Sequence, residues 1–174
     1  MQQQNLHINS INIKDGILDN DFGGYGKHPS ISFPLSWNKV EGAKSYALYM
    51  IDYDATHVVG FPFIHWLVAN IKENKLDYDA THLNKDIIQG QNSRTKATWI
   101  NNQNKIISKS ELLEHANYTG PTPPDKAHFY TVFIFALDKE KLDLNNGFFL
   151  EELLKEIKDH IISFDYINLE YKKI

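Results

Sequence analysis

The run from His128 to Leu137 is the feature that most constrains the fold of this chain. Aromatic and β-branched side chains occupy it almost continuously, and it contains neither glycine nor proline. Such side chains favour strands because they pack well on a pleated surface. The run therefore predicts a strand, the most strongly marked one in the sequence.

Other segments show weaker strand patterns. The first alternates apolar and polar residues with a period close to two, and the last alternates imperfectly. A glycine-rich stretch, Asp21–Pro29, predicts a loop, because glycine permits positive φ and proline blocks regular pairing. The further predicted strands are Leu6–Ile13, Ile31–Trp37, Ser45–Tyr53, Ile64–Ile71 and Ser163–Lys172.

Helical patterns are few. Apolar residues at helical spacing predict one amphipathic helix from about 147 to 160, with Asn145 or Asn146 as its N-cap. Ser108 and Glu111, three residues apart, predict the capping box of a short helix near 110–116. Because the strands are not interleaved with helices, the sequence predicts a mostly β fold and disfavours a doubly wound nucleotide-binding fold.

The composition narrows the available chemistry. A length of 174 residues suits a single domain over 1–174, and 0 Cys removes disulfides and thiolate chemistry. A net charge of −4 gives no long-range attraction to nucleic acid or to anionic membranes. The start of the chain lacks a signal pattern, and no apolar run approaches the roughly 20 residues of a transmembrane helix. We therefore expect a cytoplasmic protein, without stable membrane insertion, that works through His, Asp, Glu, Ser and backbone groups.

Asp52-Tyr53-Asp54 lies at the end of the predicted strand Ser45–Tyr53. On extended backbone, residues i and i+2 share one face, about 7 Å apart. The two carboxylates could share a proton, hold a cation or an amine, or act as acid and base. The alternative is a turn in which one Asp accepts backbone N–H bonds while the other is solvated.

Two further patterns contain histidine. His65 precedes Trp66 within an apolar strand, where it is either a core histidine or a ligand-binding group. The loop Gly120–Pro124 contains three prolines and leads to His128 and Tyr130. Proline fixes the loop backbone, which suits a preorganised ligand site, although a plain transition from loop to strand has the same pattern.

The order of these motifs is more specific than any one of them. The sequence carries D-Y-D-A-T at 52–56, H-W at 65–66, G-P-T-P-P at 120–124 and H-F-Y at 128–130. This order resembles the phosphatidylethanolamine-binding protein (PEBP) family, particularly its bacterial Raf-kinase-inhibitor-like branch, whose signatures read D-P-D-A-P, H-W, G-P-x-P-P and H-R-Y. The resemblance runs from about residue 8 to the end of the chain.

The resemblance implies a β-sandwich of two sheets with a C-terminal helix, and a small pocket for anions such as phosphate or a phospholipid head group. It implies a non-enzymatic ligand-binding protein, with a protein kinase or protease as a further candidate partner, and it implies no cofactor. Carried over by motif, the ligand-binding residues are Asp52, Asp54, His65, Gly120, Pro121, Pro123, Pro124, His128 and Tyr130.

The chain departs from the family signatures at three positions. Tyr53 and Thr56 replace the two prolines of D-P-D-A-P, so the loop that carries the acids is less rigid. Phe129 replaces the arginine of H-R-Y, which removes one positive charge near the pocket. The segment 98–118 is also longer and more polar than the bacterial branch implies, and it is a candidate rim or partner surface.

Aspartates beside a phosphate raise an electrostatic difficulty, because like charges repel. We expect His65 and His128, when protonated, to supply the opposing charge, so that phosphate affinity rises as pH falls through about 6.5. Two alternatives use the same residues. One is a hydrolase with an Asp/His acid–base pair, and the other is a mixed oxygen and nitrogen metal site.

Overall fold

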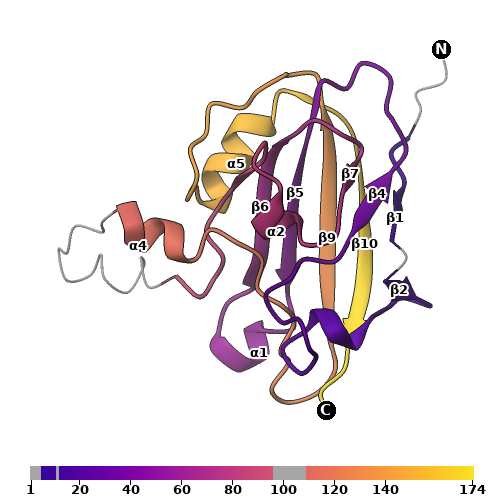
Figure 1. Cartoon of the computed structure of the whole chain (residues 1–174), viewed down its shortest axis with the longest axis vertical. Coiled ribbons are helices and arrows are strands. Elements are labelled where there is room, and N and C mark those ends of the chain that lie inside the picture. Colours follow the sequence, from indigo (N-terminus) through magenta and orange to yellow (C-terminus); the bar gives the residue numbers. More distant parts are fainter. Residues whose placement is uncertain (1–4, 11, 96–108) are drawn as a thin grey trace.

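Two β-sheets form the framework of the protein, as seen in a computed structural model that describes residues 5–10, 12–95 and 109–174 (Figure 1). Helices are short and lie at the periphery. The elements in chain order are β1 (Ile8–Asn9), β2 (Ile13–Lys14), β3 (Ile17–Leu18), the 3-10 helix η1 (Asn20–Phe22), β4 (Leu35–Trp37), β5 (Ser45–Asp52), α1 (Thr56–Val59), β6 (Phe63–Ile71), β7 (Lys75–Leu76), α2 (Ala80–Leu83), β8 (Ile88–Gln89), α4 (Lys109–Glu114), β9 (His128–Leu137), α5 (Leu150–Ile157) and β10 (Ile161–Tyr171).

The larger sheet has the strand order β2-β3-β10-β9-β5-β6-β8, and the smaller has the order β1-β4-β7. Strand β9 pairs with β10 on one side and with β5 on the other, antiparallel in both cases. Its buried, aromatic composition follows from this central position. The predicted strand over His128–Leu137 is thus confirmed with the same bounds.

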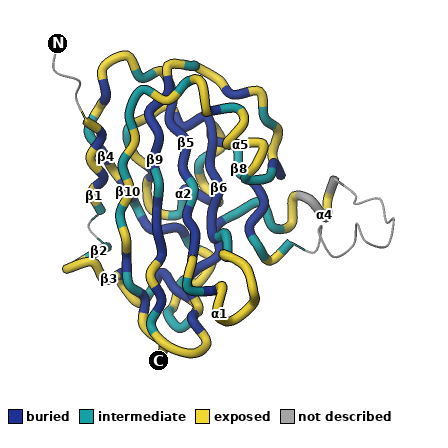
Figure 2. Tube along the Cα trace, turned by 180° about the vertical axis from the view of Figure 1, so that it is seen from behind, coloured by how far each residue is buried: buried dark blue, intermediate teal, exposed yellow. Residues whose placement is uncertain are grey.

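The main core lies between the two sheets. Successive residues of a strand face opposite sides, so Tyr130, Val132 and Ile134 of β9 pack into this core together with Leu35 and Trp37 of the smaller sheet. A second cluster on the opposite face of the larger sheet includes residues of helix α5. Figure 2 shows β5, β6 and β9 as the most continuously buried strands. The predicted mostly β sandwich with a C-terminal helix is confirmed.

Several predicted bounds were wrong. The first predicted strand is interrupted between β1 and β2, and only Leu35–Trp37 of the second is a strand. The short strands β3, β7 and β8 were not predicted, because two residues carry too little periodicity to be recognised.

Helix α5 begins later than predicted. Its first residue is Leu150, because the Glu152 carboxylate accepts the backbone N–H of Phe149 at 2.7 Å and closes the first turn there. The side chain of Asn146 instead accepts the backbone N–H of Gln89 at 2.9 Å. Helix α4 confirms a short helix near the predicted place, while Ser108 of the predicted capping box lies outside the described residues.

No helix in the described ranges combines the length and the apolar character needed to cross a lipid bilayer.

Candidate ligand-binding site

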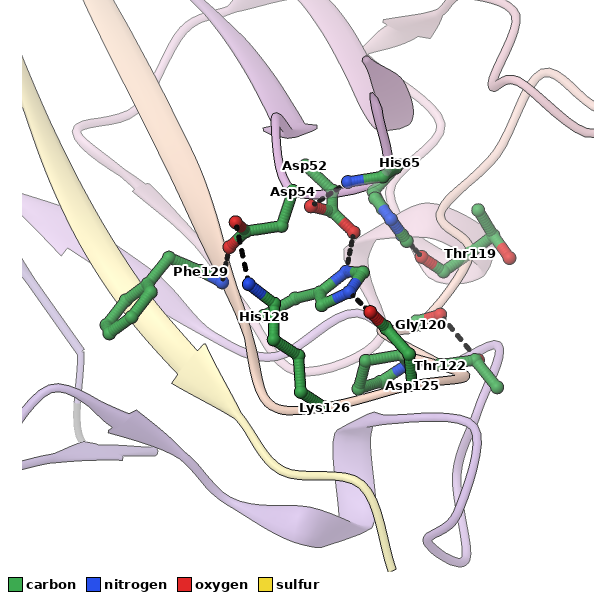
Figure 3. Close-up of polar contacts among 12 residues, drawn as sticks. Asp52, Asp54, His65, Thr119, Gly120, Thr122, Asp125, Lys126, His128 and Phe129 are labelled. Atoms are coloured by element: carbon green, nitrogen blue, oxygen red, sulfur yellow. Dashed lines mark hydrogen bonds and ion pairs between the residues drawn. The ribbon is translucent and has the colours of Figure 1, made fainter. Parts of the chain in front are cut away.

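A cavity of about 270 Å³ lies where β5 ends and β9 begins (Figure 3). The antiparallel register places Asp52, the last residue of β5, opposite Tyr130 near the start of β9. The cavity is lined by Asp52, Ala55, Val58, Val59, Phe63, His65, Arg94, Gly120, Thr122, Pro124, His128 and Tyr130. The fold thus brings residues of all four sequence motifs to one end of the sandwich.

His128 is held between two carboxylates. Its Nδ1 lies 2.7 Å from Asp52 Oδ2, and its Nε2 lies 2.8 Å from Asp125 Oδ1. The side chains of His128 and Asp52 are buried, whereas that of Asp125 is 47% exposed. Because a carboxylate only accepts hydrogen bonds, this arrangement fits an imidazolium that donates from both ring nitrogens.

The pKa of His128 is raised above its ordinary value. Burial opposes the charged ring and lowers the pKa, but the hydrogen bonds to Asp52 and Asp125 and the charges of these two groups outweigh it. His128 therefore keeps its positive charge to a higher pH than an exposed histidine does.

Asp52 is satisfied on both oxygens. One carboxylate oxygen binds His128, and the other accepts the backbone N–H of Ala55 at 3.0 Å. Its negative charge also acts on Tyr130: burial, then the charge of Asp52, raises the pKa of the Tyr130 hydroxyl far above its usual range. Tyr130 is therefore protonated at neutral pH and able to donate a hydrogen bond.

His65 differs from His128 in charge. Its Nδ1 donates to the backbone carbonyl of Thr119 at 2.7 Å, which leaves the lone pair on Nε2. Burial is the main cause that lowers the pKa of His65 to about 4. The expectation that His65 becomes protonated near pH 6.5 and attracts an anion is therefore wrong.

A β-bulge sets the direction of His65. Met50 of β5 pairs with Trp66, but the next residue, Ile51, pairs with Ile64, so His65 is the extra residue of β6. A bulge turns a side chain away from the simple alternation of a strand. Trp66 packs in the main core while His65, its neighbour, contacts the ring of Tyr130 with a centroid separation of 5.0 Å. This is how a strand residue reaches the cavity.

Three predicted residues lie outside the lining of the cavity. Asp54 instead accepts the backbone N–H of Phe129 at 2.9 Å and lies 3.9 Å from Lys126 Nζ. The carbonyls of Pro121 and Pro123 accept hydrogen bonds from the loop around Gly24 and Tyr25. Asp54, Pro121 and Pro123 therefore stabilise the loops around the cavity through these contacts.

Gly120 lies where two loops approach closely. Its backbone N–H donates to the carbonyl of Pro29 at 2.8 Å. A Cβ at this position would come within 2.6 Å of the same carbonyl oxygen and within 2.8 Å of that of Phe22. Glycine is therefore required for the packing of this wall.

The sequence did not indicate Arg94, the second cationic residue of the cavity. It follows the buried Asn92, whose side chain accepts the backbone N–H of Arg94 at 3.0 Å, and its Nε donates to Thr119 Oγ1 at 2.6 Å. A single arginine in a polar stretch carries no local pattern that could mark it. The apolar wall formed by Ala55, Val58 and Val59 was not predicted either.

The geometry limits the chemistry open to these groups. Both nitrogens of His128 are engaged by carboxylates, so the ring has no free lone pair with which to take a proton from a substrate. Within the described part of the chain, no group of three or more His, Cys, Asp or Glu residues is arranged to hold a metal ion. The cavity combines positive charge and hydrogen-bond donors with an apolar wall.

Comparison with known proteins agrees with this architecture. A model of the family described as phosphatidylethanolamine-binding protein matches residues 9–172. The chain belongs to the phosphatidylethanolamine-binding protein family.

Bacterial relatives show the same relationship. An uncharacterized protein of Bacillus subtilis (strain 168), YxkA, is 42% identical over 146 residues, which are 82% of each chain. The crystal structure of the PEBP homologue CT736 from Chlamydia trachomatis D/UW-3/CX has a TM-score of 0.78 at 26% identity, covering 98% of this chain and 99% of that one. Escherichia coli YbcL shares the fold, with a TM-score of 0.74 at 24% identity over 98% of this chain and 100% of that one. The resemblance seen in the sequence is thus confirmed, and ligand binding is the kind of function that the family carries.

Proposed function

We propose that this protein is a non-enzymatic binding protein whose cavity takes a small anion, either phosphate or the head group of a phosphorylated molecule. The observation that carries the proposal is the pairing of two cationic side chains, Arg94 and His128, in the lining of one small cavity. An arginine forms charge-assisted hydrogen bonds to phosphate oxygens, and an imidazolium in the same lining adds positive charge that attracts the anion.

The engaged state of the acids supports this proposal. Asp52 directs its oxygens at His128 and at the backbone N–H of Ala55, and Asp54 is outside the lining. The repulsion expected between these acids and a phosphate is therefore reduced by their own partners. A histidine with a raised pKa and a neighbouring guanidinium leave the cavity able to attract negative charge.

The apolar wall supports a ligand with a nonpolar portion. Val58 and Val59 of α1 line the cavity and are 42% and 47% exposed. A head group bound near Arg94 and His128 would leave its attached chain in contact with these side chains. We propose further that such binding modulates a protein kinase or protease partner.

Calorimetric titration with inorganic phosphate and with O-phosphorylethanolamine tests the proposal. We expect both to bind, and Arg94→Gln to weaken each by about tenfold, the loss expected for one charged hydrogen-bonding partner. Lys155→Gln is the matched control: it removes the same charge from a lysine on α5 that pairs with Glu151 and is absent from the cavity lining, so it should change neither affinity. Absence of binding by the unmodified protein refutes the proposal, and turnover of p-nitrophenyl phosphate would support the hydrolase instead.

The pH dependence expected from the sequence is revised by the two histidines. Affinity should fall as pH rises through the raised pKa of His128, because that ring then loses its charge. Between pH 6.5 and 5, His65 should contribute no gain, since its pKa is lowered to about 4. Titration of phosphate at several pH values measures this profile.

A further inference from the structure

The carboxylate of Asp125 covers the second ring nitrogen of His128. It accepts from Nε2 at 2.8 Å, while Asp52 accepts from Nδ1 at 2.7 Å (Figure 3). The His128 side chain is 1% exposed and that of Asp125 is 47% exposed, so the acid lies on the solvent side of the ring. Thr122 and Pro124 of the same loop line the cavity, which places Asp125 at its edge.

Asp125 thus occupies the position that the oxygen of a bound anion would take on His128. The signatures G-P-x-P-P and H-R-Y leave the residues between them unspecified, and in this chain Asp125 follows Pro124 directly. Asp52 and Asp125 differ in how easily each can move away from His128. Asp52 is buried and also holds Ala55, whereas the exposed Asp125 can turn into water, where its charge is solvated.

We propose that Asp125 is a specificity-determining residue of the cavity, an internal anion that a ligand must displace from His128. This inference rests on the proposed anion-binding function. Because Asp125 is part of the same chain, it competes at a high effective concentration. A ligand binds only if its interactions with the cavity contribute more free energy than is lost when Asp125 leaves His128.

The proposal predicts which anions are admitted. A simple carboxylate such as acetate replaces one carboxylate by another and gains little. A phosphate presents three strong acceptor oxygens and up to two charges, and can engage His128 and Arg94 together. Asp125 therefore selects phosphate-type anions against carboxylates.

Titration of inorganic phosphate and acetate against Asp125→Asn and Asp125→Ala tests this inference. Asn keeps the shape of the side chain without its charge, and Ala removes the competing acceptor altogether. We expect phosphate to bind about fivefold more tightly to both variants, and the preference for phosphate over acetate to shrink by a similar factor, as the loss of one charge-assisted hydrogen bond would give.

Asp138→Asn is the matched control. Asp138 also pairs with a histidine, His160 Nδ1 at 2.9 Å, but it follows the end of β9 opposite to the cavity. Asp138→Asn removes one negative charge, as Asp125→Asn does, and should leave the affinities for phosphate and acetate unchanged. Thermal unfolding of each variant verifies that it is folded.

The outcomes separate the two proposals. Phosphate binding that is equal or weaker in both Asp125 variants overturns this inference while leaving the anion site in place. A gain of the same size in Asp138→Asn overturns it too, because the cause would then be net charge. No binding to any of the proteins refutes the anion site and this inference with it.

Discussion

Replacing Asp52 by Asn removes a negative charge from the lining of the cavity while keeping the shape of the side chain. In the unmodified protein, Asp52 accepts the backbone N–H of Ala55 at 3.0 Å. The side-chain carbonyl of Asn can accept the same hydrogen bond, so the turn after β5 is retained. The contact that changes is the 2.7 Å hydrogen bond from His128 Nδ1. A neutral amide replaces a carboxylate beside a buried imidazolium.

The burial of both partners sets the size of the effect. The side chains of His128 and Asp52 are 1% and 5% exposed, so solvent screens their interaction little. Complete loss of a partner from such a pair costs about 3–5 kcal/mol, and a hydrogen bond to a charged group is worth about 1.5–3 kcal/mol. Because Asn still offers a hydrogen bond, we expect Asp52→Asn to lower the free energy of unfolding by about 2 kcal/mol at pH 6.

The loss should depend on pH. The folded-state pKa of His128 lies above its ordinary value, so its contribution is complete below the unfolded-state value and disappears as pH rises through the folded-state value. The difference between the two proteins should therefore shrink at pH 9. Urea denaturation at pH 6 and pH 9, followed by tryptophan fluorescence, to which the buried Trp37 and Trp66 contribute, measures both differences.

The exposed pair of Asp138 and His160 provides the control for this experiment. Its atoms lie 2.9 Å apart, but the side chains of His160 and Asp138 are 36% and 52% exposed. A surface pair contributes about 0–1 kcal/mol, so Asp138→Asn should cost far less than Asp52→Asn. Equal losses from the two variants, or a loss in Asp52→Asn that does not change between pH 6 and pH 9, would refute the role given to the buried charge.

Two further predictions concern the pH response and the second core. His65 has its pKa lowered to about 4 in the folded protein, so stability should be complete above pH 6.5 and fall by about 3 kcal/mol as pH drops toward 4. His65→Gln keeps a donor for the Thr119 carbonyl but has no titrating ring, so it should not show this loss of stability between pH 6.5 and 4. Urea denaturation at several pH values measures the free energy of unfolding of both proteins. An equal loss in His65→Gln and in the unmodified protein contradicts the lowered pKa of His65. Leu153→Ala on α5, at a fully buried position, should lower the free energy of unfolding by about 2–5 kcal/mol, whereas the exposed Leu154→Ala should cost far less, and similar losses at both positions would contradict the packing of this helix.

The local composition of the chain was enough to predict its main strands. The run over His128–Leu137 and the run that begins at Ser45 form β9 and β5, because β-branched and aromatic side chains favour a pleated, buried surface wherever they occur. The order of the Asp, His and proline motifs likewise indicated the family. The composition of a strand and the order of motifs can both be read along the chain without knowing which residues meet in space, which is why the sequence alone contains them.

The tertiary structure decided how the cavity is built. The bulge at His65 and the pairing of Asp52 with Tyr130 depend on strand register, and the placement of Arg94 depends on a loop closed by distant contacts. Burial lowers the pKa of His65, whereas at His128 the hydrogen bonds and charges of Asp52 and Asp125 outweigh burial and raise the pKa, so the fold gives the two histidines different charge states. Register, loop closure and desolvation arise from residues far apart in the chain, so the sequence supplied the groups and the fold determined their charge and direction.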